Sequence, residues 1–257
     1  MPNKLAFDEL SQHAGEPAEL FRIVSRQLVE AGEFHRLFDL RLVERRHELG
    51  LSPEPHASIE DLDSHVAAKL EQGYLDACRE VGQLFLKAGQ SHVAWRYLRP
   101  TGEKQAMQQW LASVVPDDDN ADELIELALH EGIDPERGYA WLLARRGTCQ
   151  GITELEGMQA HLSAEQLAAC ATVLVRQLHG ELLANLHGHL EQLGVTALQG
   201  QSVQQLLTSQ PKLMAEGNFH IDTSHLSTTV RFARLLTDPS ILEMAIDLAE
   251  YGSQLDD

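Results

Sequence analysis

The sequence is poor in aromatic residues and cysteine, and it has no long apolar run. Aromatic residues make up 5% of its 257 residues, and there are three cysteines. Cys78, Cys149 and Cys170 are far apart and odd in number, so we expect no disulfide framework and favour a reducing compartment.

No apolar stretch approaches the roughly 20 residues that span a bilayer, and residues 1–9 lack the basic start and apolar run of a signal peptide. We therefore expect a cytoplasmic protein with no membrane partner.

Strand patterns are also missing. The β-branched residues occur singly rather than in alternating runs, which is not typical of β-strands. Leucine and alanine are abundant instead, and both favour the helical backbone. The hydrophobic fraction of 43% is enough to fill a core. The composition predicts an all-α protein.

Basic residues are scarce. The chain has 20 Lys and Arg against 39 Asp and Glu, a net charge of −19. Residues before Pro116 carry −4 of this charge and the remainder carries −15. Such a surface repels phosphate backbones and anionic lipids, so we expect no nucleic-acid partner. A basic peptide would be attracted, although we favour solubility as the main role of the charge.

Apolar residues at steps of three and four, with glycine or proline between the runs, predict a series of helices. The expected ranges are 17–31, 33–49, a helix starting at Ser58 and running to 88, 90–99, 103–114, 121–131, 135–147, 163–193, 203–207, 223–236 and 239–251. Gly147 is expected to end one helix, and Gly180 and Gly188 to bend the longest. The charged loop 116–120 is the best boundary. It predicts helical hairpins in 1–115 and an acidic helical region in 116–257 that continues from them.

The segment 81–94 reads as two helices joined by a tight turn, with small residues where the helices would cross. It resembles a tetratricopeptide-type (TPR-like) repeat in Gly82, Phe85, Gly89 and Ala94. The resemblance implies antiparallel helical hairpins stacked as an α-solenoid, whose concave surface binds a protein or peptide. An earlier hairpin matches at Gly32, with Ser25 in place of the first glycine.

The spacing departs from that family. Gly32 and Gly89 are 57 positions apart, which is not a multiple of its 34-residue period. The array is therefore expected to be irregular, and the family's peptide-clamping residues cannot be mapped. The alternative is a set of ordinary hairpins in an irregular all-α domain; we favour repeat-like stacking.

The strongest metal candidate is a group of two histidines and one carboxylate, His220, Asp222 and His225. These are plausible zinc ligands, but residues five apart on one helix point about 140° from each other. The group converges only if the chain turns at Asp222. That residue has an alternative role as N-cap of a helix starting at Thr223, and the positive end of the helix dipole disfavours a cation. We favour the cap.

A second candidate is a partner-binding patch of Trp95, Arg96 and Arg99, because aromatic residues and arginine dominate interface hot spots. The alternative is that Trp95 and Tyr97 pack between neighbouring helices, which we favour.

Nucleotide-binding, phosphate-loop, Gly-x-Ser-x-Gly, His-Glu-x-x-His and EF-hand patterns are missing. We therefore predict no cofactor and no catalytic residue. The expected function is a non-enzymatic helical-repeat scaffold that binds a protein or peptide, with preference for a basic one. The alternative is a metal-dependent enzyme that uses His220, Asp222 and His225.

Overall fold

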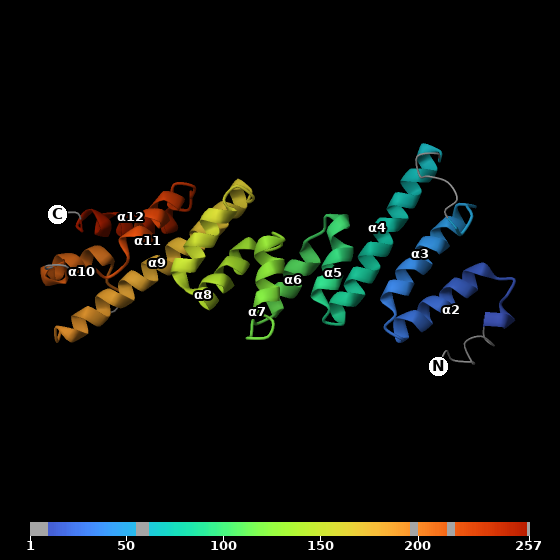
Figure 1. The fold of residues 1–257 in the computed structure, drawn as a ribbon, viewed down its shortest axis with the longest axis horizontal. Helices are drawn as coiled ribbons and strands as arrows, with labels where there is room; N and C mark the ends of the chain where they lie inside the picture. Colours follow the sequence, from blue (N-terminus) through green and yellow to red (C-terminus); the bar gives the residue numbers. More distant parts are fainter. Residues whose placement is uncertain (1–9, 55–61, 196–199, 215–218, 256–257) are drawn as a thin grey trace. The chain divides into compact units, whose positions relative to one another are not determined.

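The structure is a computed structural model, and it describes residues 10–54, 62–195, 200–214 and 219–255. These residues form helices joined by short turns, and none of them lies in a β-strand, which confirms the all-α prediction (Figure 1). The chain divides into two units, Met1–Ala112 and Ser113–Asp257. The division lies three residues before the boundary expected from the sequence. Among the described residues, no helix combines the length and the apolar character needed to cross a membrane.

The first unit, Met1–Ala112, is unit 1 and contains helical hairpins. Its helices are α2 (Pro17–Glu30), α3 (Phe34–Glu48), α4 (Ser64–Lys87), α5 (Ser91–Leu98), the 3₁₀ turn η2 (Arg99–Thr101) and α6 (Gln105–Ser113), whose last residue lies past the boundary. Asp63 caps α4 by accepting from the His65 N–H at 2.9 Å. The start that we expected at Ser58 lies outside the described residues.

The two turns that carry the expected glycines have the same geometry. The backbone φ is 70° at Gly32 and 75° at Gly89, a left-handed conformation that favours glycine. In each turn, the N–H after the glycine donates to the carbonyl five residues earlier, over 2.9 Å in the first and 3.0 Å in the second. This is the Schellman arrangement, which satisfies the last carbonyls of the helix and reverses the chain.

Helices α4 and α5 cross closely at Gly82. A Cβ added there would lie 2.6 Å from Leu98 Cγ and 3.2 Å from the carbonyl oxygen of Ala94. Phe85 and Ala94 are buried beside it. Gly82 therefore has the role that the sequence suggested, because only a residue without a side chain allows this approach.

Unit 2 is organised around one long helix, α9 (Ala164–Gln192), which Gly180 and Gly188 do not interrupt. The other elements are α7 (Ala121–Ile125), the π-helical turn η3 (Glu126–His130), α8 (Pro135–Met158), α10 (Val203–Ser209), the 3₁₀ turn η4 (Pro211–Met214), α11 (Thr223–Ala233) and α12 (Pro239–Ser253). Ser163 begins α9 with the expected capping box, because it exchanges hydrogen bonds with Gln166. The leucines of α9 form the centre of two apolar clusters.

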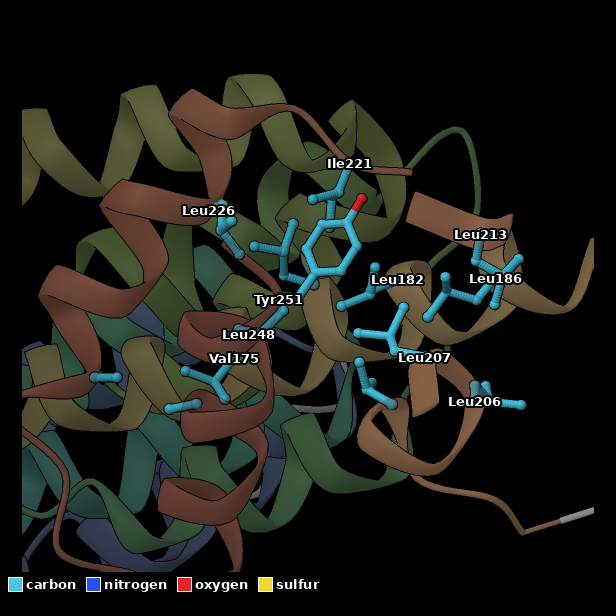
Figure 2. Packing of buried hydrophobic residues seen from close by; sticks show 14 of the residues in the cluster. Val175, Leu182, Leu186, Leu206, Leu207, Leu213, Ile221, Leu226, Leu248 and Tyr251 are labelled. Carbon is cyan, nitrogen blue, oxygen red and sulfur yellow. The ribbon is translucent and has the colours of Figure 1, made fainter. Parts of the chain in front are cut away.

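The first apolar cluster joins α9 to α7, η3, α8 and α11, and the second joins it to α10, η4, α11 and α12. Figure 2 shows the second cluster, in which the ring of Tyr251 lies among Leu182, Ile221, Leu226 and Leu248. Leu182, Leu248 and Tyr251 have no exposed surface. This burial is what holds the last three helices of the unit against α9.

Helix α8 differs from the prediction. We expected a helix that ends at Gly147, and Gly147 does leave the helical conformation, with φ 78° and ψ 168°. Helix resumes at once and continues to Met158. This continuation is not evident from the local sequence, because 148–158 is rich in glycine and threonine, which are weak helix formers. Burial of Ile152 and Leu155 in the first cluster outweighs that weak propensity.

Candidate functional site

His220, Asp222 and His225 do not form a common site. His220 is buried, and its ring faces the hydroxyl of Tyr251 at 3.0 Å. Asp222 caps α11 instead, accepting hydrogen bonds from the N–H groups of Ser224 and His225. The hydrogen bonds from Ser224 lower the pKa of the Asp222 carboxyl. In the part of the chain that the structure describes, no three His, Cys, Asp or Glu side chains are grouped so that they could hold a metal ion.

The structure also separates the three residues of the expected partner patch. Trp95 is 6% exposed, so its ring belongs to the core of unit 1, whereas Arg96 and Arg99 are exposed. Tyr97 packs against Phe85 with a centroid separation of 5.6 Å, and its hydroxyl lies 2.7 Å from Nδ1 of His35. The aromatic rings of this region therefore join α3, α4 and α5 internally, and the indole of Trp95 is not offered to a partner.

An open groove of about 890 Å³ lies in unit 2 between α9 and the part of α8 that precedes Gly147. The thiol of Cys170 lies 3.7 Å from the carbonyl oxygen of Pro135, and the hydroxyl of Thr148 donates to Glu181 over 2.6 Å. Residue numbers therefore rise in the same direction along both walls. The walls are two parallel helices, and the second part of α8 provides the return between them.

The wall formed by α8 presents an arginine and a tryptophan. Asp134 caps the helix by accepting from the backbone N–H of Arg137 at 3.2 Å, and it also accepts from the Arg137 guanidinium at 3.0 Å. The guanidinium carbon lies 5.9 Å from the ring centroid of Trp141, one helical turn further on. This contact is within the range of a cation–π interaction. Both side chains are half-buried, so the pair is held in place and still reaches the groove.

The wall formed by α9 includes residues with little or no side chain. Gln177, Gly180 and Ala184 line it, and all three are exposed. A Cβ added at Gly180 would have no atom within 4 Å apart from its chain neighbours and the backbone of its own helix. A residue of this kind leaves room for a ligand side chain and exposes the helix backbone. Gly180, which we expected to bend α9, thus lies on one side of the groove.

The charged groups of the groove are mostly paired. Arg176 lies 3.5 Å from Glu136, and Arg137 pairs with Asp134. The carboxylate of Glu181 accepts from Thr148 and, at 2.8 Å, from the side-chain amide of Gln177. Three carboxylates and two guanidinium groups line the groove. Residues 113–257 as a whole contain 7 basic and 22 acidic residues, a net charge of −15, so the groove lies in a strongly acidic unit.

Unit 1 has a second groove, of about 830 Å³, between α3 and α4. Leu42, Val43, Leu70 and Tyr74 give it an apolar lining. The guanidinium of Arg45 beside it already donates to the Lys69 carbonyl at 3.1 Å. The groove of unit 2 is the better candidate site because it combines an aromatic ring, polar side chains and an open glycine face.

The residues of the unit 2 groove were not singled out from the sequence. Arg137 and Trp141 have the i, i+4 spacing that places two side chains together on one helix, and this signal could have identified one wall. The opposite wall has no such signal, because Gly180 and Ala184 are ordinary small residues in an expected helix. Comparison of the chain with models of known protein families, with curated proteins and with solved structures gives no match.

Proposed function

We propose that this protein is a non-enzymatic helical-repeat scaffold that binds a protein or peptide segment in the groove between α8 and α9. The observation that carries the proposal is the composition of the two walls. One wall holds a half-buried tryptophan with an arginine on it, and the other has an exposed glycine with open space above it. Tryptophan and arginine are the residues most enriched at interface hot spots.

The polar groups of the groove suit an extended peptide. Gln177 and Glu181 lie on the α9 wall and supply amide and carboxylate groups that can pair with a peptide backbone. Gly180, which lies between Gln177 and Glu181 in the sequence, leaves space for a side chain of the ligand. Trp141 offers a large rigid surface on the opposite wall, and such a ring loses little conformational entropy on binding.

The partner that we propose is a basic segment. The net charge of −15 on residues 113–257 attracts positive charge over a distance of about 10 Å at 0.1 M salt. This attraction speeds association and selects partners more than it adds affinity. Binding is therefore expected to weaken as the salt concentration rises.

The proposal also includes an irregular TPR-like arrangement of the hairpins and a cytoplasmic location. The hairpin arrangement is supported by the shared turn geometry at Gly32 and Gly89 and by the close crossing at Gly82.

A phage-displayed library of random 12-residue peptides, selected on the full-length protein, tests the binding site. Gly180→Trp is expected to fill the groove without disturbing the fold, because the glycine faces open space. The matched control is Gly157→Trp. Gly157 is an exposed glycine of α8 that does not line the groove, and a Cβ added there would also have no other atom within 4 Å.

The expected result is a set of basic peptides that bind the wild type and lose about tenfold or more in affinity with Gly180→Trp, a change of about 1.4 kcal/mol. The Gly157→Trp control should bind them like the wild type. Peptides that bind all three proteins equally would place the binding surface elsewhere. A library that yields no specific binder would contradict the proposal.

A further inference from the structure

A chain of hydrogen bonds runs through the second apolar cluster of unit 2 and connects α9, α12 and the segment that precedes α11. Nε2 of His220 lies 2.9 Å from Nδ1 of His189 on α9. Nδ1 of His220 lies 3.0 Å from the hydroxyl of Tyr251 on α12, and that hydroxyl also accepts from the His220 backbone N–H at 2.9 Å. Asn185 on α9 donates to the His220 carbonyl at 2.6 Å. The buried imidazole therefore joins α9 to α12.

We propose that this chain, His189–His220–Tyr251, is an acid-sensitive lock that holds α12 against α9 while both imidazoles are neutral and loosens it when the chain takes up a proton.

The neutral chain has one arrangement in which every buried donor of the chain meets an acceptor. The Tyr251 hydroxyl accepts the backbone N–H of His220 and donates its own hydrogen to Nδ1 of His220. Nε2–H of His220 then donates to Nδ1 of His189. Each donor in this sequence faces one acceptor, as buried polar groups require.

One added proton gives the chain more hydrogen-bond donors than acceptors. A proton on Nδ1 of His220 directs a second N–H at the Tyr251 hydroxyl, whose own hydrogen must turn away into the apolar cluster. A proton on Nδ1 of His189 sets two N–H groups against each other across 2.9 Å, unless His220 changes tautomer and moves the mismatch to Tyr251. In both cases a buried donor is left without an acceptor, which is costly in a site of low polarity.

Burial lowers the pKa of His220, and the positive charge of a protonated His189 lowers it further. The closed unit therefore binds this proton less tightly than an opened one does, and acid favours the opened form. His220 is 9% exposed and Tyr251 is fully buried, so water does not relieve the mismatch in the closed form.

Several other ionisable groups on the surrounding elements bind partners outside this chain. Asp222 caps α11 through the N–H of Ser224, and Glu250 accepts from Gln204. Asp247 pairs with His179 at 3.0 Å, a second link between α12 and α9 that a proton on His179 would strengthen. The remaining ionisable groups nearby are His187 and Glu191 on α9, Lys212 on η4, His225 on α11 and Glu243 on α12, and α10 has none. Acid is thus expected to weaken the contact between α12 and α9 through the His220 chain, and to strengthen it at His179.

Hydrogen exchange of the α12 amides, read by mass spectrometry from pH 7.5 to pH 5.0 and corrected for intrinsic exchange, tests the lock. The protection factor of α12 is expected to fall by up to about tenfold for each pH unit below about 6.5, while α8 keeps its protection. His220→Asn removes the titrating ring and should abolish the loss of α12 protection in acid. His187→Asn is the matched control, since it removes a half-buried histidine of α9 outside the chain, and it should leave the dependence intact.

The ¹⁵N chemical shifts of the wild-type imidazoles provide a test that needs no variant. His220 is expected to remain neutral while α12 is protected, and to take up its proton only as α12 loses protection. Equal protection of α12 at pH 7.5 and pH 5.0 would overturn the proposal. Loss of the pH dependence in His187→Asn, or its survival in His220→Asn, would also overturn it.

Discussion

The two units hold their helices together in different ways. In unit 1, charged and aromatic side chains connect the helices: Arg41 of α3 makes two hydrogen bonds to Glu80 of α4, at 2.7 and 2.8 Å. In unit 2, leucine side chains of a single helix serve two apolar clusters. Unit 1 has 13 basic residues to balance 17 acidic ones, and residues 113–257 have 7 against 22. Unit 2 still pairs its few cations across helices, for example Arg176 with Glu136 and Arg231 with Glu156, so the difference lies in the use of one long helix as the centre of both apolar clusters.

The largest expected effect is the loss of a central leucine from unit 2. Leu182→Ala removes a fully buried side chain from the second cluster, and it should lower the free energy of unfolding by about 2–5 kcal/mol. The measurement is urea unfolding followed by circular dichroism. Leu193→Ala is the control, because that side chain is 43% exposed. Equal effects of the two substitutions would contradict a core centred on α9.

The close crossing of unit 1 should show the next largest effect. Gly82→Ala places a Cβ 2.6 Å from Leu98, and strain of this kind costs about 1–3 kcal/mol, although alanine favours the helix. Gly180→Ala faces open space and should instead stabilise α9 by up to about 1 kcal/mol. Opposite signs in thermal unfolding would confirm that Gly82, unlike Gly180, is required by packing. A stabilising Gly82→Ala would refute the close crossing.

The ion pairs of unit 1 should have a smaller effect. Glu80 and Glu44 raise the pKa of Arg41, which remains charged throughout the accessible pH range. Arg41→Lys retains the charge and loses the paired hydrogen bonds to Glu80, which should cost about 1 kcal/mol at this half-exposed site. Arg36→Lys changes a pair whose arginine is 72% exposed, and should have almost no effect on chemical unfolding. Similar values for both would show that the geometry of the Arg41 pair is unimportant.

The smallest expected effect concerns the cap of α11 in unit 2. Hydrogen bonds from Ser224 lower the pKa of Asp222 in the folded protein, so the charged cap stabilises the fold above the unfolded pKa. That contribution is lost as the pH falls through the folded value. Asp222→Asn preserves a capping oxygen without the charge. The variant should melt slightly below the wild type at pH 7 and at the same temperature near pH 2. A difference that persists at pH 2 would assign the effect to something other than the charge.

The helices of this protein were largely predictable because their signals are local. The capping box of Ser163 and Gln166, the N-cap at Asp222 and the turn at Gly89 each lie within a few residues of sequence. Contacts between distant residues were less predictable: in the groove between α8 and α9, only the spacing of Arg137 and Trp141 marks one wall, and no local signal marks the other. Asp222 and His220 are near each other in sequence, but one caps a helix and the other is buried against Tyr251, which lies 31 residues away. No spacing rule reveals a partner at that distance.

The helical class, most helix limits and the acidic charge follow from the sequence alone, because backbone propensity, capping and net charge depend on nearby residues or on simple sums. The remaining features come from tertiary packing. Burial against α9 maintained helix through 148–158 despite weak propensity, and the parallel alignment of α8 with α9 opened a groove beside Gly180. Packing of α12 near α9 also enclosed His220 between them. These features depend on surfaces brought together from distant parts of the chain, and burial acts only once those surfaces meet.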